Sequence, residues 1–181
     1  MTLSLAPTTF LTGLVLLVFG ILFFLNRPGW QRAVEAFPRS PLASYILMGT
    51  AGVWFLYKML HLSPADFGSY STLIFGLFAV VLVGSFAFVK DFLAVRGLAA
   101  LWLLLSMEIL RSAFGWYELP QRLFLVTFTY AIITLSLFLG HSPWLLRNFF
   151  EWLYRGAGRS RIFGGALAAY GLLLVVVTFT Y

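Results

Sequence analysis

Six long apolar runs, separated by short polar or charged connections, make up most of this chain. Each run is long enough to cross roughly 30 Å of hydrocarbon as an α-helix. We therefore predict an all-α integral membrane protein, a bundle of six transmembrane helices that forms a single domain over residues 1–181. The predicted spans are approximately 8–25, 42–61, 70–89, 97–114, 123–140 and 162–181. The longest segment between spans, 141–161, is too short for a folded extramembrane domain, so any function must lie in the bundle, at its surfaces or in a partner.

Proline positions support these limits. All seven prolines lie outside a predicted span or at its edge, as expected because proline disrupts a helix interior. Three prolines follow a serine, the pattern of an N-cap and a first helical residue. These pairs, each expected to mark a helix start, are Ser40-Pro41, Ser63-Pro64 and Ser142-Pro143.

Two connections have the pattern of amphipathic helices. In the segment WLLRNFFEWLYR, 144–155, charged residues recur every four positions while Trp152 and its apolar neighbours lie mostly on another face. The charged positions are Arg147, Glu151 and Arg155. The segment 28–37 is a shorter version, with Trp30 on its apolar stripe. Both predict interfacial helices that dock on anionic lipid or on a partner subunit; the alternative is that they lie flat only because apolar side chains prefer the interface.

The charge distribution predicts an orientation. The first, third and fifth connections contain most of the basic residues, and Lys and Arg favour the cytoplasmic side. They are Arg27, Arg32, Arg39, Lys90, Arg96, Arg147, Arg155, Arg159 and Arg161, against Lys58, Arg111 and Arg122 on the other side. We therefore expect cytoplasmic basic loops, both termini outside, and no removable signal peptide. Compact loops and termini favour a bacterial inner membrane.

Composition narrows the function classes. The chain is 61% hydrophobic and 10% charged, with a mean hydropathy of +0.95, unlike soluble domains. Its net charge of +6 comes from scattered residues and not from a basic block, which argues against a nucleic-acid partner. Cysteine is absent, which excludes disulfides, thiolate-bound metals and cysteine nucleophiles.

Glu108 and Arg111 are charged residues placed before the end of an apolar run. Glu108 is expected within the outer leaflet's hydrocarbon, where an ionised side chain calls for a partner or a wet cavity. Small residues share its helix face, so that face is expected to contact protein. The functional hypothesis is a polar cluster of Lys58, Glu108 and Arg111 that binds an anionic or protonatable ligand or relays protons. It would open towards His61, Asp66 and Glu118.

A structural interpretation competes with this hypothesis. Glu108 and Arg111, three residues apart on one helix, can form an intrahelical ion pair. Lys58 would then extend to the outer headgroups and belong to no cluster.

The two histidines, His61 and His141, are predicted at opposite membrane surfaces, so they cannot jointly ligate one haem iron or metal within a monomer. We predict no cofactor, although single axial ligation of haem or chlorophyll by either histidine stays an alternative. No zinc-protease, P-loop or nucleophile-elbow motif is present. The sequence therefore predicts no catalytic site and no metal site.

Small residues recur at helix-packing intervals in several spans. They are Gly13 and Gly20 in the first; Gly76, Val80 and Gly84 in the third; Gly164, Gly165, Ala168, Ala169 and Gly171 in the sixth. They predict close packing within the monomer or against other chains. The leading hypothesis is a non-catalytic integral subunit that helps to assemble or stabilise a larger membrane complex, with other membrane subunits or further copies of itself as partners. The alternatives are a small channel or carrier with a polar cluster around Glu108, and an oxidoreductase subunit with a pigment or haem.

Overall fold

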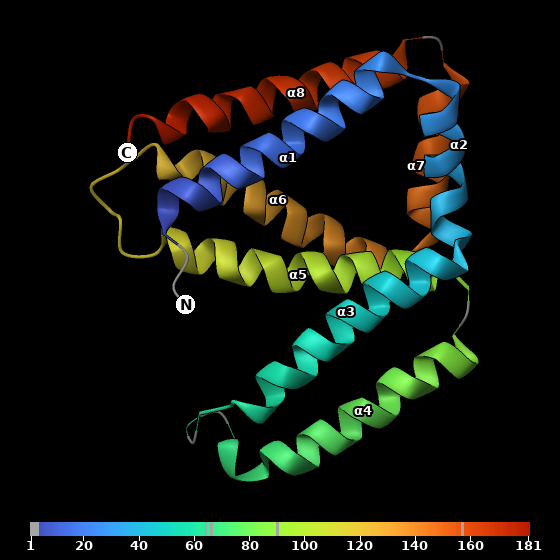
Figure 1. Cartoon of the computed structure of the whole chain (residues 1–181), viewed down its shortest axis with the longest axis vertical. Coiled ribbons are helices and arrows are strands. Elements are labelled where there is room, and N and C mark those ends of the chain that lie inside the picture. The colour runs from blue at the N-terminus through green and yellow to red at the C-terminus, as the bar shows by residue number, and fades with distance from the viewer. Residues whose placement is uncertain (1–3, 64, 66, 90, 157) are drawn as a thin grey trace.

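The structure, a computed structural model, describes residues 4–63, 65, 67–89, 91–156 and 158–181, and this part of the chain is all-helical. The long helices run back and forth between two ends of the molecule, and the start of α1 and the end of α8 lie at the same end (Figure 1). In chain order the long helices are α1 (Leu5–Leu25), α3 (Pro41–Leu60), α4 (Ser71–Phe88), α5 (Leu93–Ala113), α6 (Arg122–His141) and α8 (Arg159–Thr178). Their bounds confirm the predicted helices to within four residues.

Five helical segments are long and apolar enough to cross a membrane. They are α1, α5, α6, α8 and the segment Gly68–Phe88, which joins the short 3₁₀ helix η3 (Gly68–Tyr70) to α4. The predicted second span, α3, forms a 20-residue helix but is not among the five. The physical reason is its composition, since α3 carries Lys58 and several weakly polar side chains such as Ser44, Tyr45 and Tyr57.

α1 and α8 form the most extensive helix pair, through small residues on facing surfaces. A Cβ atom added to Gly13 would lie 2.8 Å from the carbonyl oxygen of Gly171, and one added to Gly164 would overlap the backbone of Phe24. Ser160 at the start of α8 links the two helices, because its hydroxyl donates a buried 2.8 Å hydrogen bond to the carbonyl oxygen of Phe23 on α1. The glycines that were predicted to pack the first and sixth spans therefore allow close packing of α1 against α8 within the monomer.

α5 packs against both α6 and α3. α3 and α5 run in the same direction (Figure 1). A Cβ on Gly97 of α5 would lie 2.5 Å from the amide nitrogen of Met48 on α3, so the two backbones approach closely there. This contact sets the register that brings the C-terminal turn of α3 alongside the second half of α5.

α3 and α4 form an antiparallel hairpin that lies to one side of the other long helices (Figure 1). Along it, Tyr45 stacks on Phe86 with ring centroids 5.4 Å apart, and Phe55 meets Phe78 edge-on at 4.9 Å. No described residue of α4 is buried, and α3 is its main neighbour.

Two shorter helices, α2 (Pro28–Ala36) and α7 (Trp144–Arg155), lie side by side across the end of the molecule opposite the termini (Figure 1). The bounds of α7 match the predicted amphipathic helix. Both helices run crosswise to the long ones, as expected for segments that lie along a membrane surface. The 3₁₀ helix η1 (Phe37–Arg39) connects α2 to α3.

Of the predicted Ser-Pro helix starts, Ser40 is confirmed as an N-cap: its hydroxyl accepts a 3.2 Å hydrogen bond from the amide of Ala43, and Pro41 is the first helical residue. α7 begins at Trp144, with Pro143 in the N-cap position, so Ser142 lies one residue further out than predicted. Pro64, Asp66 and Lys90 lie outside the described residues.

Candidate functional site

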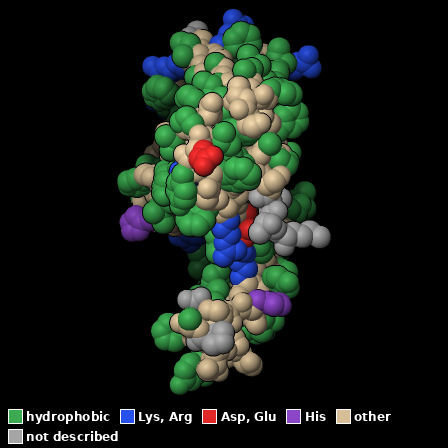
Figure 2. Space-filling view, turned by 90° about the vertical axis from the view of Figure 1, so that its left-hand side faces the viewer, with side chains coloured by type: hydrophobic (Ala, Val, Ile, Leu, Met, Phe, Trp, Pro, Cys, Tyr) green, Lys and Arg blue, Asp and Glu red, His purple; other side chains and the backbone are tan. Residues whose placement is uncertain are grey.

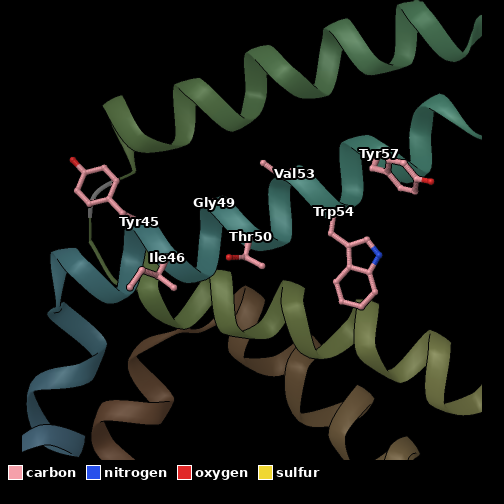
Figure 3. A pocket seen from close by; sticks show the side chains of 7 residues that line it. All are labelled: Tyr45, Ile46, Gly49, Thr50, Val53, Trp54 and Tyr57. Carbon is pink, nitrogen blue, oxygen red and sulfur yellow. The ribbon is translucent and has the colours of Figure 1, made fainter. Parts of the chain in front are cut away.

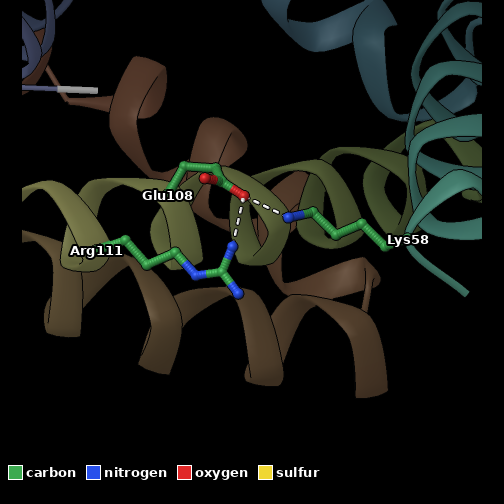
Figure 4. Close-up of polar contacts among 3 residues, drawn as sticks. All are labelled: Lys58, Glu108 and Arg111. Atoms are coloured by element: carbon green, nitrogen blue, oxygen red, sulfur yellow. Dashed lines mark hydrogen bonds and ion pairs between the residues drawn. The ribbon is translucent and has the colours of Figure 1, made fainter. Parts of the chain in front are cut away.

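The predicted polar cluster forms between α3 and α5. Lys58 donates a hydrogen bond to Oε1 of Glu108, and Nη1 of Arg111 lies 3.7 Å from the same oxygen (Figure 4). The Lys58 and Glu108 side chains are only 22% and 21% exposed, whereas Arg111 is 61% exposed. Glu108 is therefore the shared acceptor of two cations, one partly buried and one at the surface.

The cluster carries one more positive charge than negative. Lys58 is also oriented by Trp54, one turn earlier on α3, because its Nζ lies 5.9 Å from the centroid of the indole ring. The exposed guanidinium of Arg111 is the group that could meet an incoming anion. These contacts differ from the structural interpretation in one respect, since Lys58 bonds Glu108 across the helix interface and does not extend away from it.

The face of α5 that carries Glu108 was expected to contact protein along its length. It does so from Gly97, which meets α3, to Glu108. Arg111 and Gly115 are exposed in the monomer, because α3 ends at Leu60 and covers no more of this face.

The other predicted members of the cluster lie apart. His61 caps the end of α3, where its Nδ1 lies 2.8 Å from the carbonyl oxygen of Tyr57 and its ring lies over the Tyr57 ring at 4.3 Å. Glu118 is exposed in the connection between α5 and α6. Figure 2 looks onto the terminal end of the molecule: hydrophobic side chains cover most of it, and Lys and Arg side chains form a small patch near its middle.

A shallow, largely open apolar groove follows one face of α3, and sequence reasoning did not predict it. Its volume is about 880 Å³, and seven residues of α3 line it (Figure 3). They are Tyr45, Ile46, Gly49, Thr50, Val53, Trp54 and Tyr57. The spacing of these residues could have revealed a common helix face, but only the position of α4 shows that this face stays open.

The residues predicted for docking divide into two groups. Trp30 faces inward, edge-on to Phe23 with ring centroids 5.5 Å apart. Trp152, Arg155 and Glu151 are exposed on α7, and Glu151 pairs with Arg147 at 3.5 Å. Arg159 covers Trp152, with its guanidinium carbon 4.7 Å from the ring centroid. The indole of Trp152 is therefore partly covered by the chain itself.

Among the described residues, no group of three or more His, Asp or Glu side chains could hold a metal ion. His61 ends α3 and His141 ends α6, and these two helix ends lie at opposite ends of the molecule (Figure 1). The two imidazoles therefore cannot share one ligand within the monomer.

Comparison of the chain with known protein families, with curated proteins and with solved structures found no match in any of the three. The site's geometry is therefore the basis of the proposals that follow.

Proposed function

We propose that this chain is a non-catalytic integral subunit that docks onto other membrane-spanning subunits and stabilises a larger complex. The observation that carries the proposal is the isolation of α4, the one long helix without a buried residue among those described. In hydrocarbon an apolar side chain gains nothing by leaving lipid, so exposure alone does not require a partner. The small residues on α4 supply the further argument.

Gly76 and Gly84 lie eight residues apart on one face of α4, where small residues let two membrane helices approach closely, and Val80 lies between them. A Cβ added to Gly76 would meet no described atom within 4 Å, and Val80 is 72% exposed. On α1 and α8, by contrast, Gly13, Gly20, Gly164 and Gly171 are all in close contact with the facing helix. The face around Gly76 and Val80 is thus suited to a helix that the chain does not itself provide.

The groove on α3 extends this docking surface. Gly49 and Thr50 leave room at its centre, and Tyr45, Trp54 and Tyr57 supply aromatic rings with polar groups at their edges. Aromatic anchors of this kind are enriched in protein interfaces. A partner helix lying in the groove would cover the side of α3 that α5 leaves open.

We further propose that α3 is the sixth membrane span. Its register with α5, fixed at Gly97 with Met48 and at Glu108 with Lys58, places it beside a helix that is apolar enough to cross. The pairing of Lys58 with Glu108 lowers the cost of a charge in that span. Six crossings place both termini on one side, and the basic residues favour the cytoplasm for the α2 and α7 end. We assign this topology to a bacterial inner membrane.

Site-specific photocrosslinking tests the docking surface. A photoreactive residue at Val80 is expected to capture a reproducible second polypeptide in native membranes. The matched control is Leu82 on the same helix, which packs against Gly52 of α3 and is expected to crosslink only within the chain. Capture of lipid alone from Val80 would contradict the proposal.

The second candidate function is a small channel or carrier whose route passes Glu108, favoured by the surplus positive charge of the cluster. It requires water to reach Glu108 from the terminal end. Because the chain has no cysteine, Glu108→Cys can be tested with a membrane-impermeant thiol reagent, with Arg111→Cys as the exposed control and buried Ser106→Cys as the shielded one. Labelling at 108 as fast as at 111 would favour the channel, and protection like that at 106 would exclude it.

A further inference from the structure

A second, polar pocket lies where α2, η1 and α7 meet. Its volume is about 340 Å³, and it is lined by Glu35, Pro38, Arg39, Arg147, Phe150 and Glu151. Pro38 is buried, and Phe150 packs against the apolar cluster formed by the end of α6, α7 and the start of α5. The pocket therefore has an apolar base and charged walls.

Two guanidinium groups reach this site from different elements. The guanidinium carbons of Arg39 on η1 and Arg147 on α7 lie 5.6 and 5.8 Å from the centroid of one aromatic ring, that of Phe92. Phe92 has a φ of 56°, a conformation uncommon for bulky residues, and its ring is packed against the same apolar cluster. The fold thus brings two guanidinium groups, from different elements, to one aromatic ring.

Two carboxylates complete the walls. Glu151 lies 3.5 Å from Arg147, and Glu35 accepts a 3.0 Å hydrogen bond from Gln31. With two cations and two anions, the lining has no net charge. An inorganic anion would be attracted by the arginines but repelled by the glutamates. A simple cation would be attracted by the glutamates but repelled by the arginines.

A ligand that carries both a phosphate and an ammonium group can use all four side chains. Arginine recognises phosphate through planar pairs of N–H donors, and carboxylates accept hydrogen bonds from a primary ammonium. α2 and α7 lie across one end of the bundle, so the pocket is at the level of lipid headgroups if that end lies at the membrane surface.

We propose that this pocket binds the headgroup of a zwitterionic phospholipid with a primary amine, of the phosphatidylethanolamine type. The phosphodiester contacts Arg39 and Arg147, the ammonium group contacts Glu35 and Glu151, and the acyl chains leave along the apolar surface of the bundle. This site is distinct from the α3 and α4 docking surface, so it does not depend on the chain's being a subunit.

Lipid competition on the purified full chain tests the proposal. The protein in mild detergent is offered phosphatidylethanolamine, phosphatidylcholine and phosphatidylglycerol with identical acyl chains, and retained lipid is measured by native mass spectrometry. Phosphatidylcholine keeps the phosphate but its quaternary ammonium has no N–H donor, and phosphatidylglycerol lacks the ammonium. We expect phosphatidylethanolamine to be retained at least about fivefold more than either, since charged hydrogen bonds are the strong ones. Equal retention of the three lipids would overturn the proposal.

Paired variants locate the site. Arg39→Gln with Arg147→Gln is expected to reduce retention of all three lipids, and Glu35→Gln with Glu151→Gln to remove the preference for phosphatidylethanolamine over phosphatidylglycerol. The matched control, Arg32→Gln with Arg155→Gln, removes the same charge from α2 and α7 outside the pocket lining. Loss of lipid retention in the control to the same extent as in the Arg39 and Arg147 variant would refute the assignment. If a pocket variant fails to fold, the comparison of the three lipids on the unaltered chain still tests whether the protein prefers phosphatidylethanolamine.

An excess of soluble glycerophosphoethanolamine separates a headgroup site from simple adsorption of acyl chains. It is expected to displace phosphatidylethanolamine from the unaltered protein, whereas inorganic phosphate at the same concentration is not. Displacement by phosphate alone would identify a plain anion site and contradict the proposal.

Discussion

Lys58 on α3 donates a hydrogen bond to the Glu108 carboxylate of α5, across 50 positions of sequence. This bond joins α3, the long helix that is not among the five segments apolar enough to cross a membrane, to α5, which is one of the five. The two partly buried charges thereby compensate each other, as the proposed membrane-spanning position of α3 beside α5 requires.

Removing one partner of this pair is expected to cost more than removing both. Lys58→Met leaves Glu108 partly buried with only the more distant Arg111, and we expect a loss of about 1–3 kcal/mol in the free energy of unfolding. Lys58→Met combined with Glu108→Met, which leaves no uncompensated charge, should recover most of this loss. Unfolding of the purified protein in mixed detergent micelles, run as a double-mutant cycle, measures both.

Arg111→Gln is the control for that cycle, because Arg111 is mostly exposed and 3.7 Å from Glu108. It should change stability by less than about 1 kcal/mol. A larger effect than that of Lys58→Met would show that the surface cation, not the one on α3, compensates Glu108.

Neighbouring glycines on α8 should differ sharply in their tolerance of a methyl group. A Cβ on Gly164 would overlap the α1 backbone at Phe24, whereas a Cβ on Gly165 would meet only the Phe24 ring, at 3.8 Å. We expect Gly164→Ala to destabilise the protein by about 1–3 kcal/mol or more, since the backbones must separate. Gly165→Ala should be neutral or stabilising, because alanine favours helix by up to about 1 kcal/mol over glycine. Equal thermal unfolding midpoints for the two variants would contradict the close packing of α1 and α8.

Tyr154 on α7 should make stability fall at alkaline pH. Burial raises the pKa of its phenol above the usual value of 10.0; the Ser160 side chain opposes this shift in part, and the Glu35 carboxylate adds to it. The folded protein therefore holds this proton more tightly than the unfolded chain, so the stabilising effect is complete below pH 10 and is lost as the pH rises through the folded-state pKa. The thermal unfolding midpoint should drop less between pH 9 and 11 in Tyr154→Phe than in the unaltered protein. Tyr117→Phe, at an exposed tyrosine, is the control and should leave the drop unchanged.

The proposed orientation predicts which connections face the cytoplasm. Glu118→Cys, between α5 and α6, should react with an impermeant thiol reagent applied outside intact cells, and Arg32→Cys on α2 should react only after the membrane is permeabilised. Both positions are exposed, and the chain has no cysteine to interfere. The reverse pattern would invert the topology while leaving the fold unchanged.

The helices were predictable because their limits are local. Apolar runs of membrane-spanning length, ended by proline and charged residues, locate α1, α5, α6 and α8, and charges every four residues locate α7. The close contacts of Gly13 and Gly164 were also predictable from the spacing of small residues along each helix, since small residues on a shared face favour helix packing.

Other features depend on which helix faces which, and periodicity does not contain that information. Spacing places Arg111 on the same face as Glu108, but the end of α3 at Leu60 is what leaves Arg111 exposed. The convergence of Arg39 and Arg147 on Phe92 joins three separate elements, and no local pattern marks it. The open groove on α3 likewise arises from the position of α4.

Gentle extraction of the tagged chain from its native membrane, followed by native mass spectrometry, tests the central proposal most directly. A subunit that docks through α3 and α4 should be recovered with the same partner proteins in a fixed ratio. Replacing Val80 with Trp should release them, whereas Ile162→Trp at an exposed position of α8 should not. Recovery of the chain alone, or only with copies of itself, would contradict the subunit function and favour the channel or carrier.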